Sequence, residues 1–177
     1  LSPIWMPPTS RVPHLGISIG TNPELYFYLD YIPRTDLWTN VDALDRYHDP
    51  LGEHFLALQA DPRFKPMVTR NCYLRQAQGP SAIMLSAAVD EQTITDLFDH
   101  LHGALDRWIE WVLDGDPVPV AEQPLLAARD RQIRRSIIDR NPSNVLAFRA
   151  LGEKTTLQLL DIMSASVRGT PTVGETP

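Results

Sequence analysis

Side chains that can hold or transfer a proton occupy alternate positions in two short apolar segments, residues 13–20 and 24–32. In chain order they are His14, Ser18, Glu24, Tyr26, Tyr28 and Asp30. Because side chains alternate between the two faces of a strand, these residues share one face of a predicted hairpin. That face either meets water or lines a pocket with proton donors of graded pKa, and the periodicity leaves both interpretations open.

A second group of charged side chains lies in the C-terminal third, where arginines gather in an otherwise acidic chain. Its members are Arg129, Arg131, Arg134, Arg135 and Arg140. One interpretation is a solvated helix face with local aspartate partners. The other is a surface that recognises carboxylates or an acidic partner.

The patterns of several common reactive sites are missing. The single cysteine, Cys72, excludes an intramolecular disulfide and a Cys-rich metal site. Because Cys72 lies in a strand-like run, we expect a buried apolar side chain rather than a nucleophile. His100 and His102 diverge on a predicted helix, so no metal site is predicted. The sequence contains no glycine-rich phosphate loop and no G-x-S-x-G motif.

Composition narrows the class of protein further. The 177 residues include 16 Lys+Arg and 22 Asp+Glu, a net charge of −6, which argues against nucleic-acid binding. No apolar run approaches the roughly 20 residues that a membrane span requires. The first residues lack the basic and apolar regions of a secretory signal, so we expect a cytoplasmic protein.

The elements that must position these residues follow from hydrophobic periodicity. The segments 13–20 and 24–32 predict one hairpin, and the segments 69–78 and 81–89 predict a second around Gly79-Pro80. Helical spacing covers 39–59, with a break at Asp49-Pro50, and then 91–113, 121–138 and 145–167. We expect one domain over residues 1–168 and a frayed tail over 169–177. This order predicts an α+β fold, an antiparallel sheet covered by helices on one or both faces.

Three segments share a pattern with a known family: YLDYIPRTDL at 28–37, GPSAI at 79–83 and LAARDRQI at 126–133. They resemble the corresponding segments of the red chlorophyll catabolite reductases, relatives of the ferredoxin-dependent bilin reductases. Their order and spacing fit the family over roughly residues 14–165. The resemblance implies a three-layer α/β/α sandwich with a central antiparallel sheet. It also implies an open-chain tetrapyrrole pocket between the sheet and the C-terminal helices.

The resemblance implies specific roles as well. Such reductases bind no flavin or metal, take electrons from ferredoxin and protonate the substrate with side chains. The family has a functional acid after the Arg-Asp helix, where this chain has Asp139, the expected proton donor. Gly16 stands where the family has a glutamate, and Tyr28 where bilin reductases have a histidine.

We expect Tyr28 and His14 to hydrogen-bond the reacting system and Arg75 or Arg129 to hold a carboxylate. Ser18, Tyr26 and Asp30 are further candidates for substrate contact. Arg134, Arg135 and Arg140 could receive an acidic ferredoxin.

Two other functions stay open on the same fold. One is a cofactor-independent cyclase or isomerase of specialised metabolism acting on a polyene-like substrate, which the loss of the glutamate at Gly16 favours. The other is a non-catalytic carrier of a pigment or ligand. The sequence leaves open the substrate, the electron donor and the oligomeric state.

Overall fold

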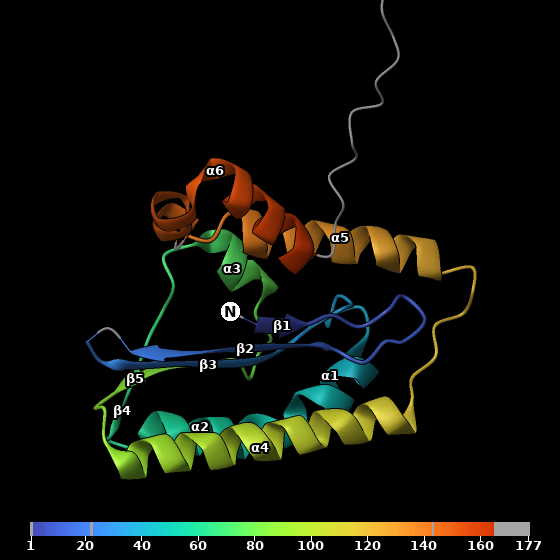
Figure 1. Ribbon diagram of the computed structural model, residues 1–177. Helices are drawn as coiled ribbons and strands as arrows, with labels where there is room; N and C mark the ends of the chain where they lie inside the picture. Colours follow the sequence, from blue (N-terminus) through green and yellow to red (C-terminus); the bar gives the residue numbers. More distant parts are fainter. Residues whose placement is uncertain (1, 22, 143, 165–177) are drawn as a thin grey trace, which may run out of the picture.

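An antiparallel sheet forms the middle of the molecule in the computed structural model, which describes residues 2–21, 23–142 and 144–164 (Figure 1). Its strand order is β1-β2-β3-β5-β4. The strands are β1 (Ser2–Ile4), β2 (His14–Thr21), β3 (Leu25–Ile32), β4 (Phe64–Pro66) and β5 (Ile83–Ala87). The predicted first hairpin is confirmed: β2 pairs with β3 in a register that sets Gly16 opposite Asp30 and Ser18 opposite Tyr28.

Helices cover both faces of this sheet (Figure 1). One face carries the α4 layer, which comprises α1 (Val41–Tyr47), the short 3-10 helix η1 (Asp49–Leu51), α2 (Gly52–Ala60) and α4 (Glu91–Asp114). The other face carries the α5 layer, which comprises α3 (Cys72–Ala77), α5 (Gln123–Asp139) and α6 (Asn144–Met163). The three-layer α/β/α sandwich is therefore confirmed.

The two faces of the sheet bury very different amounts of apolar surface. Against the α4 layer lies a large core that includes Leu15, Phe27, Leu85, Leu97 and Trp108. Against the α5 layer lies a smaller buried apolar cluster formed by Ile32, Ile137, Ile138 and Leu160. Polar side chains therefore occupy much of the sheet face beneath the α5 layer.

Local signals explain the helix boundaries in the α4 layer. Asp90 caps α4 by accepting a hydrogen bond from the backbone N–H of Thr93 at 2.9 Å, and Gly115 ends the helix with a φ of 76°. The predicted break at Asp49-Pro50 is confirmed, because η1 separates α1 from α2 there.

The predicted strand over 69–78 is wrong, because this segment forms α3. The side chain of Asn71 caps the helix by accepting hydrogen bonds from the backbone N–H groups of Tyr73 and Leu74. The expected burial of Cys72 is wrong for the same reason, since its side chain is exposed on α3. The strand β5 pairs with β3 and with the short β4 instead of forming a second local hairpin.

The last helix is interrupted where the periodicity predicted a continuous one. Gly152 has a φ of 76° and a ψ of 167°, so α6 consists of two helical segments joined at a kink. The predicted end of this helix at 165–167 and the predicted tail 169–177 lie outside the described residues. In the part of the chain that the structure describes, no helix is long and apolar enough to cross a membrane.

Candidate active site

A buried carboxyl group, that of Asp30, lies near the end of β3 on the sheet face beneath the α5 layer. Asp30 is 1% exposed. The hydroxyl of Tyr28 donates to its Oδ2 at 2.8 Å, and the backbone N–H of Gly79 donates to its Oδ1 at 3.1 Å. Burial raises the pKa of Asp30 to about 7, although both hydrogen bonds act in the opposite direction. A carboxyl group with this pKa can both hold and release a proton near neutral pH.

Tyr28 is the partner of Asp30 and is equally enclosed. Its ring is 1% exposed. Burial, followed by the charge of Asp30, raises the pKa of its hydroxyl well above the ordinary value. Tyr28 therefore stays protonated and donates its hydrogen bond to Asp30.

The backbone at Gly79 approaches Asp30 so closely that no side chain fits there. A Cβ atom at this position would lie 2.8 Å from the carbonyl oxygen of Tyr31 and 2.9 Å from both Asp30 Oδ1 and His48 Cε1. Glycine is required because it lets the 79–82 turn bring its N–H to the carboxyl group.

His14, predicted to contact the reacting system, lies in a separate buried cluster. Its Nδ1 accepts from the backbone N–H of Met6 at 2.9 Å, so the proton is on Nε2, which lies 3.2 Å from Asp130 Oδ1. Arg34 donates to both carboxylate oxygens of Asp130. Burial lowers the pKa of His14 to about 4, although Asp130 acts in the opposite direction. Neutral His14 therefore helps join the first segment of the chain to α5.

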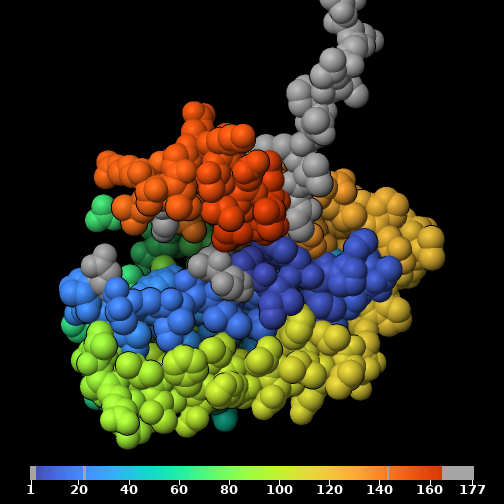
Figure 2. Space-filling model, viewed as in Figure 1, coloured from blue at the N-terminus to red at the C-terminus, as the bar shows by residue number. Residues whose placement is uncertain are grey.

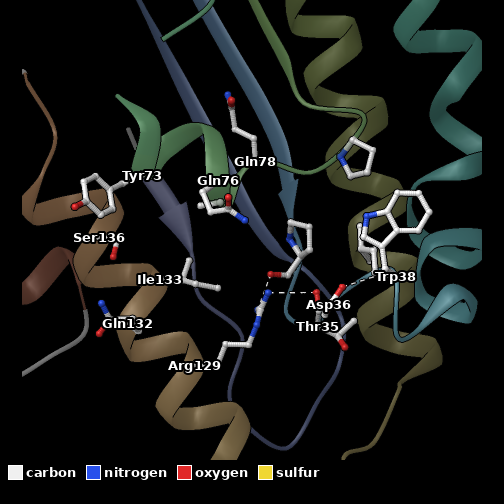
Figure 3. A pocket seen from close by; sticks show the side chains of 14 residues that line it. Thr35, Asp36, Trp38, Tyr73, Gln76, Gln78, Arg129, Gln132, Ile133 and Ser136 are labelled. Atoms are coloured by element: carbon white, nitrogen blue, oxygen red, sulfur yellow. Dashed lines mark hydrogen bonds between the residues drawn. The ribbon is translucent and has the colours of Figure 1, made fainter. Parts of the chain in front are cut away.

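A cavity of about 830 Å³ lies between the loop that follows β3 and helices α3 and α5 (Figure 3). This is within the usual range for small-molecule sites. Figure 3 shows Tyr73 on α3 and Trp38 in the loop on opposite sides of the view. The polar residues that line the cavity are Thr35, Asp36, Tyr73, Gln76, Gln78, Arg129, Gln132 and Ser136.

Arg129, one of the two predicted carboxylate anchors, lines this cavity. Its guanidinium donates to the carbonyl oxygens of Pro33 at 2.9 Å and Thr35 at 3.2 Å, and is thereby fixed at the base of the loop (Figure 3). Arg75, the alternative anchor, is exposed on α3 and donates to the carbonyl oxygen of Thr69. Arg75 is not among the residues that line this cavity.

Asp30 lies directly behind the wall of the cavity. Gln78 and Pro80 line the cavity, and Gly79 between them donates its N–H to Asp30. The cavity and the buried acid are therefore connected through one short turn.

The other predicted residues of the hairpin lie further along the same sheet face. Ser18 and Tyr26 are half-buried on the side of the sheet that carries Tyr28. Figure 2 shows that the surface is hollowed between these strands, in blue, and the helices of the α5 layer, in green and orange. At Gly16 a Cβ atom would lie 3.2 Å from the Tyr28 ring and 3.2 Å from Ile32. The Tyr28 ring thus fills the space into which a side chain at position 16 would project.

Asp139 lies apart from Asp30. It is the last residue of α5 rather than a loop residue, and it is exposed. Its role as proton donor stays a prediction.

Sequence reasoning missed Arg34, Asp130, Gly79 and His48 as site-forming residues. Arg34 and Asp130 stand in two of the segments that carry the family resemblance, so those segments were the available signal. The position of Gly79 beside Asp30 depends on a contact between residues 49 apart, which no local pattern reveals. Among the described residues, no group of three or more histidine, cysteine, aspartate or glutamate side chains could hold a metal ion.

The fold is that of a solved bilin-reductase structure. The crystal structure of phytochromobilin synthase from tomato, in complex with biliverdin, matches with a TM-score of 0.77 and 13% sequence identity. That match covers 96% of this chain and 59% of the tomato chain.

Sequence comparison defines the family. The chain belongs to the red chlorophyll catabolite reductase (RCC reductase) family, whose sequence model matches residues 5–164. The chloroplastic red chlorophyll catabolite reductase of Arabidopsis thaliana is 27% identical over 145 residues. The match covers 74% of this chain and 46% of the Arabidopsis protein, so the chain spans about half the length of that relative.

Proposed function

We propose that this protein reduces a linear tetrapyrrole, with Asp30 as the proton donor. Membership of the RCC reductase family supports the substrate class, and so does the name of the tomato protein's ligand, biliverdin. The observation that carries the proposal is the wholly buried carboxyl group with a pKa of about 7. Such a group is a general acid matched to neutral pH.

The reaction requires two electrons and two protons for each double bond reduced. An external one-electron donor of the ferredoxin type supplies the electrons in two steps, and each step increases the basicity of the tetrapyrrole. Asp30 transfers one of the two protons to the reduced substrate and becomes a carboxylate, which the Tyr28 hydroxyl and the Gly79 N–H stabilise, and the other proton comes from water in the open cavity.

Substrate binding uses the cavity beside this acid. Its volume of about 830 Å³ suits an extended conjugated ligand, and Arg129 offers a positive charge for a carboxylate. Ser18 and Tyr26 can contact substrate that extends along the sheet face.

The exposed arginines on α5 and at its C-terminal end suit an acidic electron donor. Arg131, Arg135 and Arg140 are exposed, and the guanidinium of Arg140 lies 3.9 Å from the centroid of the Tyr73 ring at the cavity wall. Arg134 instead packs over Trp5 and donates to the carbonyl oxygen of Met6. We therefore assign docking to the three exposed arginines.

The absence of a carboxylate at Gly16 favours a second candidate, an isomerisation or cyclisation without electron transfer. Asp30 would then protonate the substrate and recover the proton in the same cycle. This function predicts turnover without any electron donor. A carrier would bind the pigment and leave it unchanged.

Anaerobic assays separate these functions. Biliverdin and red chlorophyll catabolite are mixed with the protein, with and without reduced ferredoxin, and followed by visible spectroscopy and mass analysis. A product two mass units heavier that requires ferredoxin supports the reductase. An isomer formed without ferredoxin supports the second candidate, and a spectral shift without product supports the carrier.

Two variants identify the acid. Asp30→Asn should reduce turnover at least 100-fold while the binding spectrum persists, whereas Asp139→Asn should retain turnover within about 3-fold. The reverse result would assign proton donation to Asp139.

A further inference from the structure

His48 is a buried histidine that the proposed chemistry leaves unused. It is 3% exposed and stands between α1 and η1. Its Nδ1 lies 3.3 Å from the Ser81 hydroxyl, and its Nε2 has no hydrogen-bond partner in the part of the chain that the structure describes. A buried ring nitrogen without a partner is costly and points to a function.

His48 lines a cavity separate from the large one. This cavity has a volume of about 240 Å³, enough for several water molecules, and Leu44, Phe55, Pro80 and Ser81 also line it. Pro80 lines the large cavity as well. The 79–82 turn therefore stands between the substrate cavity and this smaller one.

Asp30 and His48 meet at this turn. Asp30 Oδ1 and His48 Cε1 both lie 2.9 Å from the point that a Cβ atom of residue 79 would occupy. Because residue 79 is glycine, no side chain separates the carboxyl group from the imidazole ring.

A buried acid that donates protons in every cycle needs a path for their return. Asp30 is bonded to Tyr28 and Gly79, and neither has a proton to spare: burial keeps the Tyr28 hydroxyl protonated, and the Gly79 donor is a backbone amide. The cavity that Asp30 itself lines has a volume of about 20 Å³, room for about one water molecule, so little water lies beside the carboxyl group. A neutral imidazole can accept a proton on one nitrogen and release one from the other.

We propose that His48 returns protons to Asp30 from water in the 240 Å³ cavity, a role that rests on the proposed reductase function. After Asp30 has given its proton to the substrate, His48 takes one proton from that water, whose hydroxide is neutralised by bulk solvent, and passes one across Gly79 to the carboxylate. Each cycle thereby restores the carboxylic acid and the neutral imidazole, and no electrons are exchanged.

The charges around His48 suit transient protonation. Asp45 and Asp49 line the same cavity, and the Asp30 carboxylate faces the ring from β3. All three are negative when ionised. Burial lowers the pKa of His48 to about 4, so the ring does not retain the proton it receives.

The test follows the return of the proton to Asp30 directly, in the substrate-free protein. Time-resolved infrared spectroscopy after a pH jump from 8.5 to 5.5 monitors the protonated carboxyl band, assigned by its loss in Asp30→Asn. We expect the protonated carboxyl band of Asp30 to recover at least 10-fold more slowly in His48→Ala. Adding 50 mM imidazole should increase the recovery rate of this variant several-fold. In His48→Gln the side chain fills the space of the imidazole, so recovery of the band should be slow and imidazole should not accelerate it. His102→Ala, on the exposed face of α4, is the control.

Turnover provides the second arm. In His48→Ala the first turnover should stay within 2-fold of the parent protein, whereas steady-state turnover should fall at least 10-fold. Unchanged infrared recovery in both His48 variants would overturn the relay, whatever the turnover rates. If infrared recovery depends on His48 but the protein reduces no bilin, the result would support the relay and overturn the proposed reductase function.

Discussion

Replacing Asp30 with asparagine should remove a distinctive pH dependence of stability. The pKa of this carboxyl group is about 7 in the folded protein against an ordinary 3.8. Between these values the unfolded chain has released the proton and the native protein still holds it. The native state therefore binds more protons, and the free energy of unfolding falls as the pH rises.

The magnitude follows from the pKa difference. One pKa unit corresponds to about 1.4 kcal/mol, so the loss is roughly 4 kcal/mol between pH 4 and pH 8, levelling off above pH 7. Asparagine preserves the volume of the side chain, and its amide oxygen can still accept from Gly79. The variant should therefore fold, without this pH dependence.

The assay is urea unfolding of both proteins from pH 4 to pH 8. Buried His14 and His48, with pKa values lowered to about 4, change stability in the opposite direction over part of this range. Both proteins share the contribution of the two histidines. The difference between the unfolding free energies of the two proteins therefore reports the contribution of Asp30. A difference that is flat with pH, or that grows in favour of the parent protein as the pH rises, would refute the assignment of Asp30 as a buried acid.

Three further predictions concern the polar contacts around the site. Asp130→Ala leaves the Arg34 guanidinium buried without its carboxylate partner and should lower the free energy of urea unfolding by about 3–5 kcal/mol. Asp130→Asn should lower the same free energy by a smaller amount. Gly79→Ala should cost about 1–3 kcal/mol in the same assay, whereas Gly103→Ala, in open space on α4, should be neutral or stabilising. As the pH falls from 6.5 to 4, the parent protein should lose about 3 kcal/mol relative to His14→Asn, because unfolded His14 binds a proton that the native ring excludes. Equal pH profiles would contradict the neutral state of His14.

Hydrophobic periodicity was sufficient for the regular parts of the fold. Alternation identified β2 and β3, and three- and four-residue spacing identified α4, because each buries one continuous apolar face. The same reasoning failed at α3, where the Asn71 cap and the packing of Leu74 and Ala77 against the small core decide the conformation.

The site was predictable in composition but not in arrangement. The shared face of Tyr28 and Asp30 follows from alternation, and Arg129, which lines the cavity, stands in one of the segments that carry the family resemblance. Periodicity does not show that His14 binds Asp130, 116 residues away, while Asp30 binds Gly79. These partners depend on tertiary contacts, which also set the different protonation states of the two groups.

The two sides of the sheet bury unequal amounts of apolar surface, so the two helical layers should open at different free energies. The α4 layer shares an extensive core with the sheet, whereas the α5 layer contributes the few buried residues around Ile137 and Leu160 and a cluster of polar contacts. Amide protons of α5 and α6 should therefore exchange with solvent through partial unfolding events at lower free energy than those of β3 and α4. With this order of exchange, the α5 layer would separate from the sheet while the large core, and with it the position of Asp30 on β3, stays intact.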